Sequence, residues 1–356
     1  MVRRSRKGLR AATSLAAILA AAGSWAAEGC DVGTTAGQAV GAVGILAVAP
    51  SLYMLTVGGI NVAVQTGPDG TVVVDTGAAG DAPCLLAAIK KIAPDAPISF
   101  VIDTNADAEL IGGSGILAAA GRSLAQMDFF INVTTRAATG QIAAAAESQG
   151  ADIIARQGIE ELILQQQGGE STDGALPTEV FARPQLNFIL NGEPIEVVAV
   201  PAAHSEADSV VRFNRQDVVV SGAVFDQTRF PMIDVAQGGS IQGEINALNT
   251  LANSLVFEQV PILATTGGTL IIPVRGPVSD QSDLINYRDM VATIRDRVQY
   301  DINHGMNLKQ TEAADPAQGY TSRYGSVTGS WTTTDFIGAV YRSLVAARNA
   351  RRGEKK

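Results

Sequence analysis

The sequence predicts an α/β sandwich in which two β-sheets pack together between outer layers of helices. Strand-like and helix-like segments alternate along most of the 356 residues, and this alternation occurs in two stretches of similar length. Hydrophobic residues make up 46% of the chain but aromatic residues only 5%. The core must therefore consist mainly of Val, Ile, Leu and Ala, which suits sheets covered by Ala-rich helices. The same composition excludes extensive disorder, which requires low hydrophobicity and high charge.

The first element is a predicted signal peptide over residues 1–26. Five basic residues precede the apolar run 11–22, and Ser24-Trp25-Ala26 supplies a small-x-small cleavage pattern. The run is short and Ala-rich for a membrane span, although an uncleaved anchor is the alternative. We expect an exported protein, periplasmic or secreted, with no membrane attachment after cleavage. Residues 27–51 are expected to form an N-terminal lead.

The charge of the exported chain argues against nucleic acid as a partner. Cleavage after residue 26 removes five basic residues and no acidic one, so the net charge falls from −9 to −14. Such a surface repels the phosphates of nucleic acids and anionic membranes. The chain has two cysteines, Cys30 and Cys84. A disulfide between the lead and the first helix, or two unrelated thiols, are both compatible with the sequence.

The main domain is expected to span residues 52–303, followed by a C-terminal helical extension over 304–356. In its first half, strands are predicted at 52–57, 61–66, 71–75, 98–103 and 153–155, and helices at 82–92, 113–120, 141–149 and 157–164. In its second half, strands are predicted at 186–190, 195–200, 210–213, 218–221 and 270–273, and helices at 241–255 and 283–303, while a helix at 335–347 is predicted in the C-terminal extension. Turn signals at 67–70 and 191–193 join two of the strand pairs.

Five local strings follow predicted strands in a fixed order. They are Asp-Thr-Gly at 75–77, Asp-Thr-Asn-Ala-Asp-Ala-Glu-Leu-Ile-Gly-Gly at 103–113, Pro-Ala-Ala-His-Ser-Glu-Ala-Asp-Ser at 201–209, Ser-Gly-Ala-Val-Phe at 221–225 and Ile-Ile-Pro-Val-Arg-Gly-Pro at 271–277. Together they resemble the metallo-β-lactamase superfamily over about residues 52–297. The resemblance implies an αβ/βα sandwich of two mixed β-sheets flanked by helices. It also implies a site that holds one or two zinc ions in a metallo-hydrolase.

The residues at the implied metal positions differ from the family's usual ligands. The resemblance places Asn105, Asp107 and His204 in the first zinc pocket, Glu109, Leu110 and Arg275 in the second, and Ala223 at the bridging carboxylate. An amide is a poor zinc ligand, an alkyl chain offers no lone pair, and Arg275 is a permanent cation where a dication would sit. The usual dinuclear zinc site is therefore not expected here.

Two alternatives describe what occupies the altered pocket. Asn105, Asp107, Glu109 and His204 would supply an oxygen-rich site for one hard divalent ion, such as Mn²⁺, Ca²⁺ or Mg²⁺. In the favoured alternative there is no metal cofactor, and Arg275 forms ion pairs with Glu109 or Asp107, because buried carboxylates need a partner.

His204 is the one candidate catalytic residue, with Asp107 or Glu109 to orient it as a general base. A structural, hydrogen-bonding histidine is the favoured alternative. Asp75 and Asp208 are expected to hold loops through backbone N–H groups. We therefore expect a zinc-independent pseudoenzyme that binds a small molecule or a protein partner in the remodelled pocket. The alternatives are a hydrolase of esters, lactones or amides that uses a single metal or His204, and a structural partner protein that uses its acidic surface.

Overall fold

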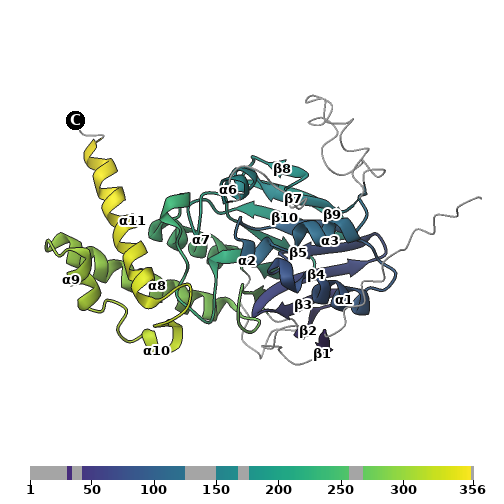
Figure 1. The fold of residues 1–356 in the computed structure, drawn as a ribbon, viewed down its shortest axis with the longest axis horizontal. Helices are drawn as coiled ribbons and strands as arrows, with labels where there is room; N and C mark the ends of the chain where they lie inside the picture. The colour runs from purple at the N-terminus through teal and green to yellow at the C-terminus, as the bar shows by residue number, and fades with distance from the viewer. Residues whose placement is uncertain (1–29, 34–41, 125–149, 167–175, 256–267, 354–356) are drawn as a thin grey trace, which may run out of the picture.

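The computed structural model describes residues 30–33, 42–124, 150–166, 176–255 and 268–353 (Figure 1). The predicted signal peptide at 1–26 and the helix predicted at 141–149 lie outside the described residues. Within the described residues, no helix is both long enough and apolar enough to cross a membrane.

The first sheet has eight strands that lie side by side in chain order. They are β1 (Asp31–Gly33), β2 (Ala42–Ala49), β3 (Leu52–Val57), β4 (Ile60–Gly67), β5 (Gly70–Val74), β6 (Ile98–Asp103), β7 (Asp152–Arg156) and β8 (Glu179–Phe181). The strands from β2 to β5 pair antiparallel, and those from β5 to β8 pair parallel. The sheet is therefore mixed, and its parallel half directs several strand ends toward the same edge.

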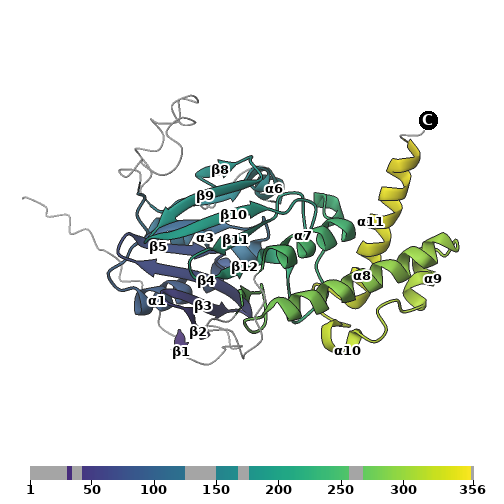
Figure 2. The ribbon, with the colours of Figure 1, turned by 180° about the vertical axis from the view of Figure 1, so that it is seen from behind.

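The second sheet has five strands in the order β13-β12-β11-β10-β9. They are β9 (Gln185–Leu190), β10 (Glu193–Ala199), β11 (Ser209–Phe213), β12 (Val218–Val220) and β13 (Leu270–Ile272). Neighbours pair antiparallel except β12 and β13, which are parallel. Figure 2 shows this sheet from behind, with α7 and α8 beside it.

The apolar core lies in layers because side chains alternate between the two faces of each strand. On β5, Val72 and Val74 pack between the two sheets, whereas Val73 packs on the outer face against the helices. Phe100 of the first sheet meets Phe188 of the second with ring centroids 5.2 Å apart. The fold class expected from the sequence, two mixed sheets between helical layers, is confirmed.

Helices cover both outer faces of the sandwich. The first sheet carries α1 (Ala82–Ile92) and α3 (Ser114–Ala120). In α1, Ala82, Leu85 and Ile89 recur at helical spacing and are all buried. The second sheet packs against α7 (Ile241–Ser254) and α8 (Gln281–Asn303), and α11 (Thr333–Gly353) packs on these two helices. The remaining helices are α2 (Ala108–Ile111), α6 (Ile159–Gln166), α9 (Leu308–Ala313) and α10 (Thr321–Tyr324).

The first sheet extends into the segment expected to be an N-terminal lead. Residues 42–49 form β2, which pairs with β3, and Val43 is buried beneath α1. Cys30 and Cys84 form a disulfide with their Cα atoms 5.4 Å apart, so the start of the described chain is linked to α1. Of the two possibilities that the sequence left open, a disulfide or two unrelated thiols, the structure has the disulfide.

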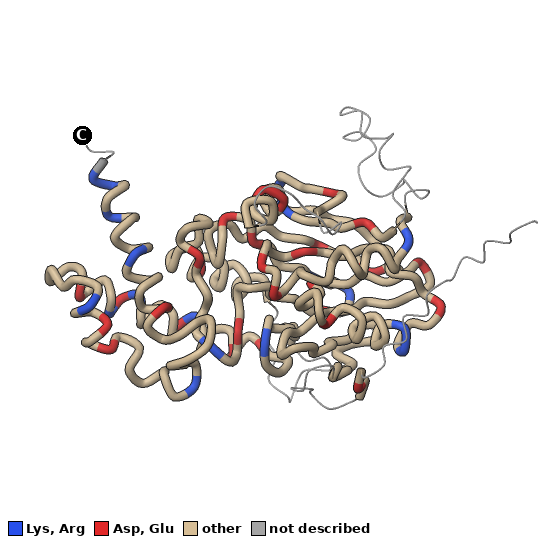
Figure 3. Tube along the Cα trace, in the orientation of Figure 1, with Lys and Arg blue, Asp and Glu red and all other residues tan. Residues whose placement is uncertain are grey.

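The C-terminal helices lie at the end of the molecule away from α1, and the last turns of α11 project outward (Figures 1 and 2). Basic residues recur along α11, whereas acidic residues are scattered over the sandwich (Figure 3).

Candidate functional site

The five strings identified in the sequence come together at one edge of the sandwich. Each begins where a strand ends, after β5, β6, β10, β12 and β13. Hydrogen bonds join them: Ser209 N–H donates to Thr104 O at 2.8 Å, and Ser221 N–H donates to Ile272 O at 3.0 Å. The site is therefore built on strand ends that the two sheets hold in fixed positions.

Asp75 and Asp208 hold loops, as expected from the sequence. Oδ1 of Asp75 accepts hydrogen bonds from the N–H and the hydroxyl of Thr104, at 3.0 and 2.9 Å. Asp208 accepts from Ser205 N–H at 2.6 Å and from its hydroxyl at 2.8 Å. Burial raises the pKa of Asp75 to about 7 and that of Asp208 to about 6. Both carboxyl groups are engaged in local structure beneath the pocket.

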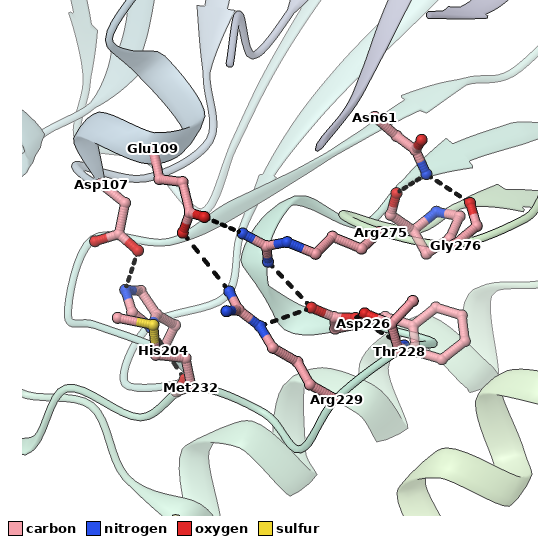
Figure 4. Close-up of polar contacts among 12 residues, drawn as sticks. Asn61, Asp107, Glu109, His204, Asp226, Thr228, Arg229, Met232, Arg275 and Gly276 are labelled. Atoms are coloured by element: carbon pink, nitrogen blue, oxygen red, sulfur yellow. Dashed lines mark hydrogen bonds and ion pairs between the residues drawn. The ribbon is translucent and has the colours of Figure 1, made fainter. Parts of the chain in front are cut away.

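His204 is buried and both of its ring nitrogens have partners (Figure 4). Nε2 lies 3.1 Å from Asp107 Oδ2, and Nδ1 lies 3.0 Å from Met232 O. Both partners are acceptors, so the arrangement fits an imidazolium that donates from both nitrogens. Burial would lower the pKa of His204, but the hydrogen bond and charge of Asp107 outweigh it and raise the pKa to about 10.

Asp107 is the anionic half of this pair. Burial would raise the pKa of its carboxyl group, but the hydrogen bond and charge of His204, with Arg229 and Arg275 nearby, lower it below the usual value. The two shifts favour an ionised pair near neutral pH.

Arg275 lies in the pocket between two carboxylates (Figure 4). Its Nη2 is 2.8 Å from Glu109 Oε1, and its Nη1 is 3.1 Å from Asp226 Oδ2. Arg229 contacts the same two groups, with Nε 3.0 Å from Asp226 Oδ2 and Nη2 3.8 Å from Glu109 Oε2. Of the two partners that the sequence suggested for Arg275, the structure has Glu109, while Asp107 pairs with His204.

The backbone on both sides of this cluster is fixed by residues outside the five strings. The side chain of Asn61, on β4, donates to Pro273 O at 2.9 Å and to Gly276 O at 2.8 Å, and so holds the loop that carries Arg275 (Figure 4). The hydroxyl of Tyr287, on α8, donates to Arg229 O at 3.2 Å.

The other substituted positions contribute structure. Oδ1 of Asn105 accepts from Asp107 N–H at 2.9 Å and so shapes the turn that presents Asp107. Leu110 is buried in an apolar cluster with Ile60 and Val274, and Ala223 packs at the edge of this cluster. Leu110 and Ala223 thus form apolar walls at positions where the resemblance implies metal ligands.

The space left in the pocket is about 10 Å³, lined by Asp107, Glu109, Leu110, His204, Ala223, Asp226, Arg229, Met232, Val274 and Arg275. This is room for about one water molecule. Among the described residues, no group of three or more His, Cys, Asp or Glu side chains is placed to hold a metal ion. The residues present do not fit the zinc centre implied by the resemblance, because His204 pairs with Asp107 and Arg275 forms an ion pair with Glu109.

Asp226, Arg229, Met232 and Asn61 were not predicted as site residues. Asp226 directly follows the string 221–225 and pairs with Arg229 three residues on, but the segment is not helical, so the spacing gave no signal of a pair. Asn61 gives no such signal, since its partners are backbone carbonyls more than 200 residues away.

Comparisons with known proteins support the fold. The sequence matches no protein-family model and no curated protein. Among solved structures, the stereoselective inverting sec-alkylsulfatase Pisa1 from Pseudomonas sp. is similar with a TM-score of 0.59 and 14% identity, over 84% of this chain and 50% of that enzyme. A double mutant of the same alkylsulfatase gives 0.59 and 14%, over 85% of this chain and 50% of the mutant. A metallo-β-lactamase from Pontibacter korlensis has a TM-score of 0.49 and 16% identity, over 70% of this chain and 99% of that one.

The two mixed sheets and their helical layers form an αβ/βα sandwich, the fold of the similar solved structures. The chain has the metallo-β-lactamase fold. It spans about half the length of the alkylsulfatase that it resembles.

Proposed function

We propose that this protein is a zinc-independent pseudoenzyme of the metallo-β-lactamase fold, which binds a ligand at the strand-end site and does not hydrolyse it. The observation that carries the proposal is the guanidinium of Arg275, which bridges Glu109 and Asp226 within the pocket. A permanent cation at this point repels a second cation and neutralises the carboxylates that would attract one.

The state of His204 supports a binding role over hydrolysis. A general base must be unprotonated at the working pH and must reach the reacting atom. With its pKa raised to about 10 and both nitrogens facing acceptors, His204 is a protonated structural residue near neutral pH. The competing hydrolase hypothesis needs either His204 as a free base or one metal ion held by Asn105, Asp107, Glu109 and His204.

Metal analysis of the purified full chain tests the proposal directly. We expect less than stoichiometric Zn²⁺, Mn²⁺, Ca²⁺ or Mg²⁺, both as isolated and after incubation with each ion and desalting. About one ion per chain that is lost in the Asp107→Ala/His204→Ala double variant would overturn the proposal. His304→Ala is the matched control, because His304 is the chain's other histidine and lies exposed at the end of α8.

A hydrolysis assay tests the same proposal without reference to metal. The substrates are a phenyl ester, a lactone, a β-lactam and a secondary alkyl sulfate, the last because the similar solved enzyme is an alkylsulfatase. We expect the wild type and His204→Gln to give the same background rate. A wild-type rate at least tenfold above that of His204→Gln, with His304→Gln unaffected, would show catalysis by this site.

We also propose that the protein is exported. A disulfide such as Cys30–Cys84 persists mainly in oxidising compartments, and a basic segment, an apolar run and a small-x-small pattern precede it. N-terminal sequencing of the protein from the cell envelope or medium is expected to begin near residue 27. A protein found in the cytosol with its N-terminal segment intact would contradict export.

A further inference from the structure

We propose that Arg275 and Arg229 form an anion site that Glu109 occupies as an internal ligand, and that a small monocarboxylate binds there when Glu109 swings out. This inference rests on the proposed binding function and names its ligand class. Two guanidinium groups converge on one carboxylate, with Glu109 Oε1 2.8 Å from Arg275 and Oε2 3.8 Å from Arg229 (Figure 4). The carboxylate of Glu109 thus marks where the carboxylate of a ligand would lie.

The two carboxylates that contact these arginines differ in how firmly they are held. The side chain of Asp226 is 4% exposed, and its Oδ1 also accepts hydrogen bonds from Thr228 N–H and its hydroxyl. The side chain of Glu109 is 52% exposed, and within the described part of the chain its carboxylate contacts the two arginines alone. Asp226 is therefore a fixed part of the site, whereas Glu109 can rotate into solvent at small cost.

The contact between Glu109 and Arg275 is a close ion pair, but it does not align as a hydrogen bond. Nη2 of Arg275 is buried and has no hydrogen-bond partner, although Glu109 Oε1 is 2.8 Å away. A planar carboxylate that approaches in the plane of a guanidinium gains charge-assisted hydrogen bonds to it. An incoming ligand would therefore satisfy a donor that Glu109 leaves unused.

The charge and shape of the pocket limit the ligand. With Glu109 turned away, the guanidinium groups of Arg229 and Arg275 share a single carboxylate, that of Asp226, so one positive charge of the two arginines is left without a partner. The site then favours a monoanion, because an unbalanced buried charge is costly.

The walls provide apolar contact for a short tail, from Leu110, Ala223, Met232 and Val274. With Glu109 in place only about 10 Å³ is free, so a ligand must use the room that this side chain vacates. A small carboxylate with an apolar group fits these limits.

Binding of sodium benzoate to the full-length protein, measured by isothermal titration calorimetry at constant ionic strength, tests this inference. Glu109→Ala is expected to bind benzoate at least tenfold more tightly than the wild type, and Glu109→Gln is expected to show a smaller gain. Glu160→Ala, which removes an exposed glutamate on α6, is the matched control and should behave as the wild type. Adding Arg275→Ala to Glu109→Ala should abolish the gain. Sodium sulfate is the comparison probe and is expected to bind more weakly than benzoate.

Equal affinity for benzoate in the wild type and both Glu109 variants would overturn the inference, as would a gain that survives Arg275→Ala. Tighter binding of sulfate than of benzoate would overturn the carboxylate assignment. Metal content is measured on the same preparations. Failure to bind benzoate in metal-free protein refutes the anion site alone, whereas stoichiometric metal in the wild type refutes both this site and the proposed function.

Discussion

Replacing Arg275 with Ala tests whether this residue substitutes for a metal as the charge partner of the pocket. The change removes a guanidinium group that is 13% exposed. Two carboxylates lose this ion-pair partner: Asp226, which is 4% exposed, and Glu109, which is 52% exposed. Breaking a buried pair by removing one partner costs about 3–5 kcal/mol. The exposed contact with Glu109 adds at most about 1 kcal/mol. Arg229 stays 3.0 Å from Asp226 and compensates part of the loss.

We therefore expect Arg275→Ala to lower the free energy of unfolding by about 2–3 kcal/mol, below the full cost of an isolated buried pair because Arg229 remains. The assay is urea unfolding of the full-length protein followed by circular dichroism. Arg288→Ala is the control, since its partner Asp289 is 62% exposed and the loss should stay below about 1 kcal/mol. Asp226→Asn in the Arg275→Ala background should cost less than the sum of the single changes. Equal losses for the Arg275 and Arg288 variants, or strict additivity with Asp226→Asn, would refute the reasoning.

Three further predictions concern the disulfide, the loop and the buried ion pair. Replacing Cys30 and Cys84 together with Ala should lower the free energy of unfolding by about 4 kcal/mol in urea, because the bond joins residues 54 apart in the sequence. Asn61→Ala removes the donor from two loop carbonyls and should cost about 1–3 kcal/mol, with faster hydrogen exchange over residues 274–276. His204→Gln should destabilise more at pH 6 than at pH 10. The folded pKa of His204 is raised from 6.5 to about 10, so its pairing with Asp107 stabilises fully below pH 6.5 and is lost as pH rises through 10.

Each of these predictions has a control and a contradicting result. His304→Gln should be neutral at both pH values, and a pH-independent effect of His204→Gln would show that the pair with Asp107 is not ionised. Treatment with a reductant should leave the cysteine double variant unchanged, and an unchanged urea midpoint on removal of the disulfide would contradict the loop-closure argument. For Asn61→Ala, exchange rates that change elsewhere but not in the loop would show that Asn61 acts on β4 alone.

The sequence predicted most of the fold because its strands alternate regularly and its turns carry Gly, Pro and Asn. The strand predicted at 52–57 and the helix predicted at 82–92 match β3 and α1 residue for residue. β2 was missed because it continues from a Gly- and Ala-rich stretch, although four of its eight residues are Val, Ile or Leu. The short helix α9 has a capping box from Asn307 to Gln310, a local signal that was not used.

The site was predictable in its positions but only partly in its contacts. The flanking Asp-Thr and Gly-Gly residues of the string 103–113 aligned Asp107, Glu109 and Leu110, which line the pocket, and Asn105, which does not. An ion pair of Arg275 was expected because buried carboxylates need a partner, but the spacing of the strings gives no way to choose between Glu109 and Asp107. That choice depends on where His204 lies, because it holds Asp107 at 3.1 Å and leaves Glu109 to the arginines. Asp226 enters the site through the turn after β12, which no motif of the sequence describes.

The pocket brings together three basic side chains and three carboxylates. The six groups are His204, Arg229, Arg275, Asp107, Glu109 and Asp226. Balance among buried charges requires that none be removed without a substitute of the same sign. Glu109 has the most exposed side chain of the six, so its charge can leave the pocket at the smallest cost. In the proposed function and ligand site, the same two arginines that repel a metal cation attract an anion in exchange for Glu109. Metal content and benzoate affinity therefore both test the effect of the positive charge of Arg229 and Arg275 in the pocket.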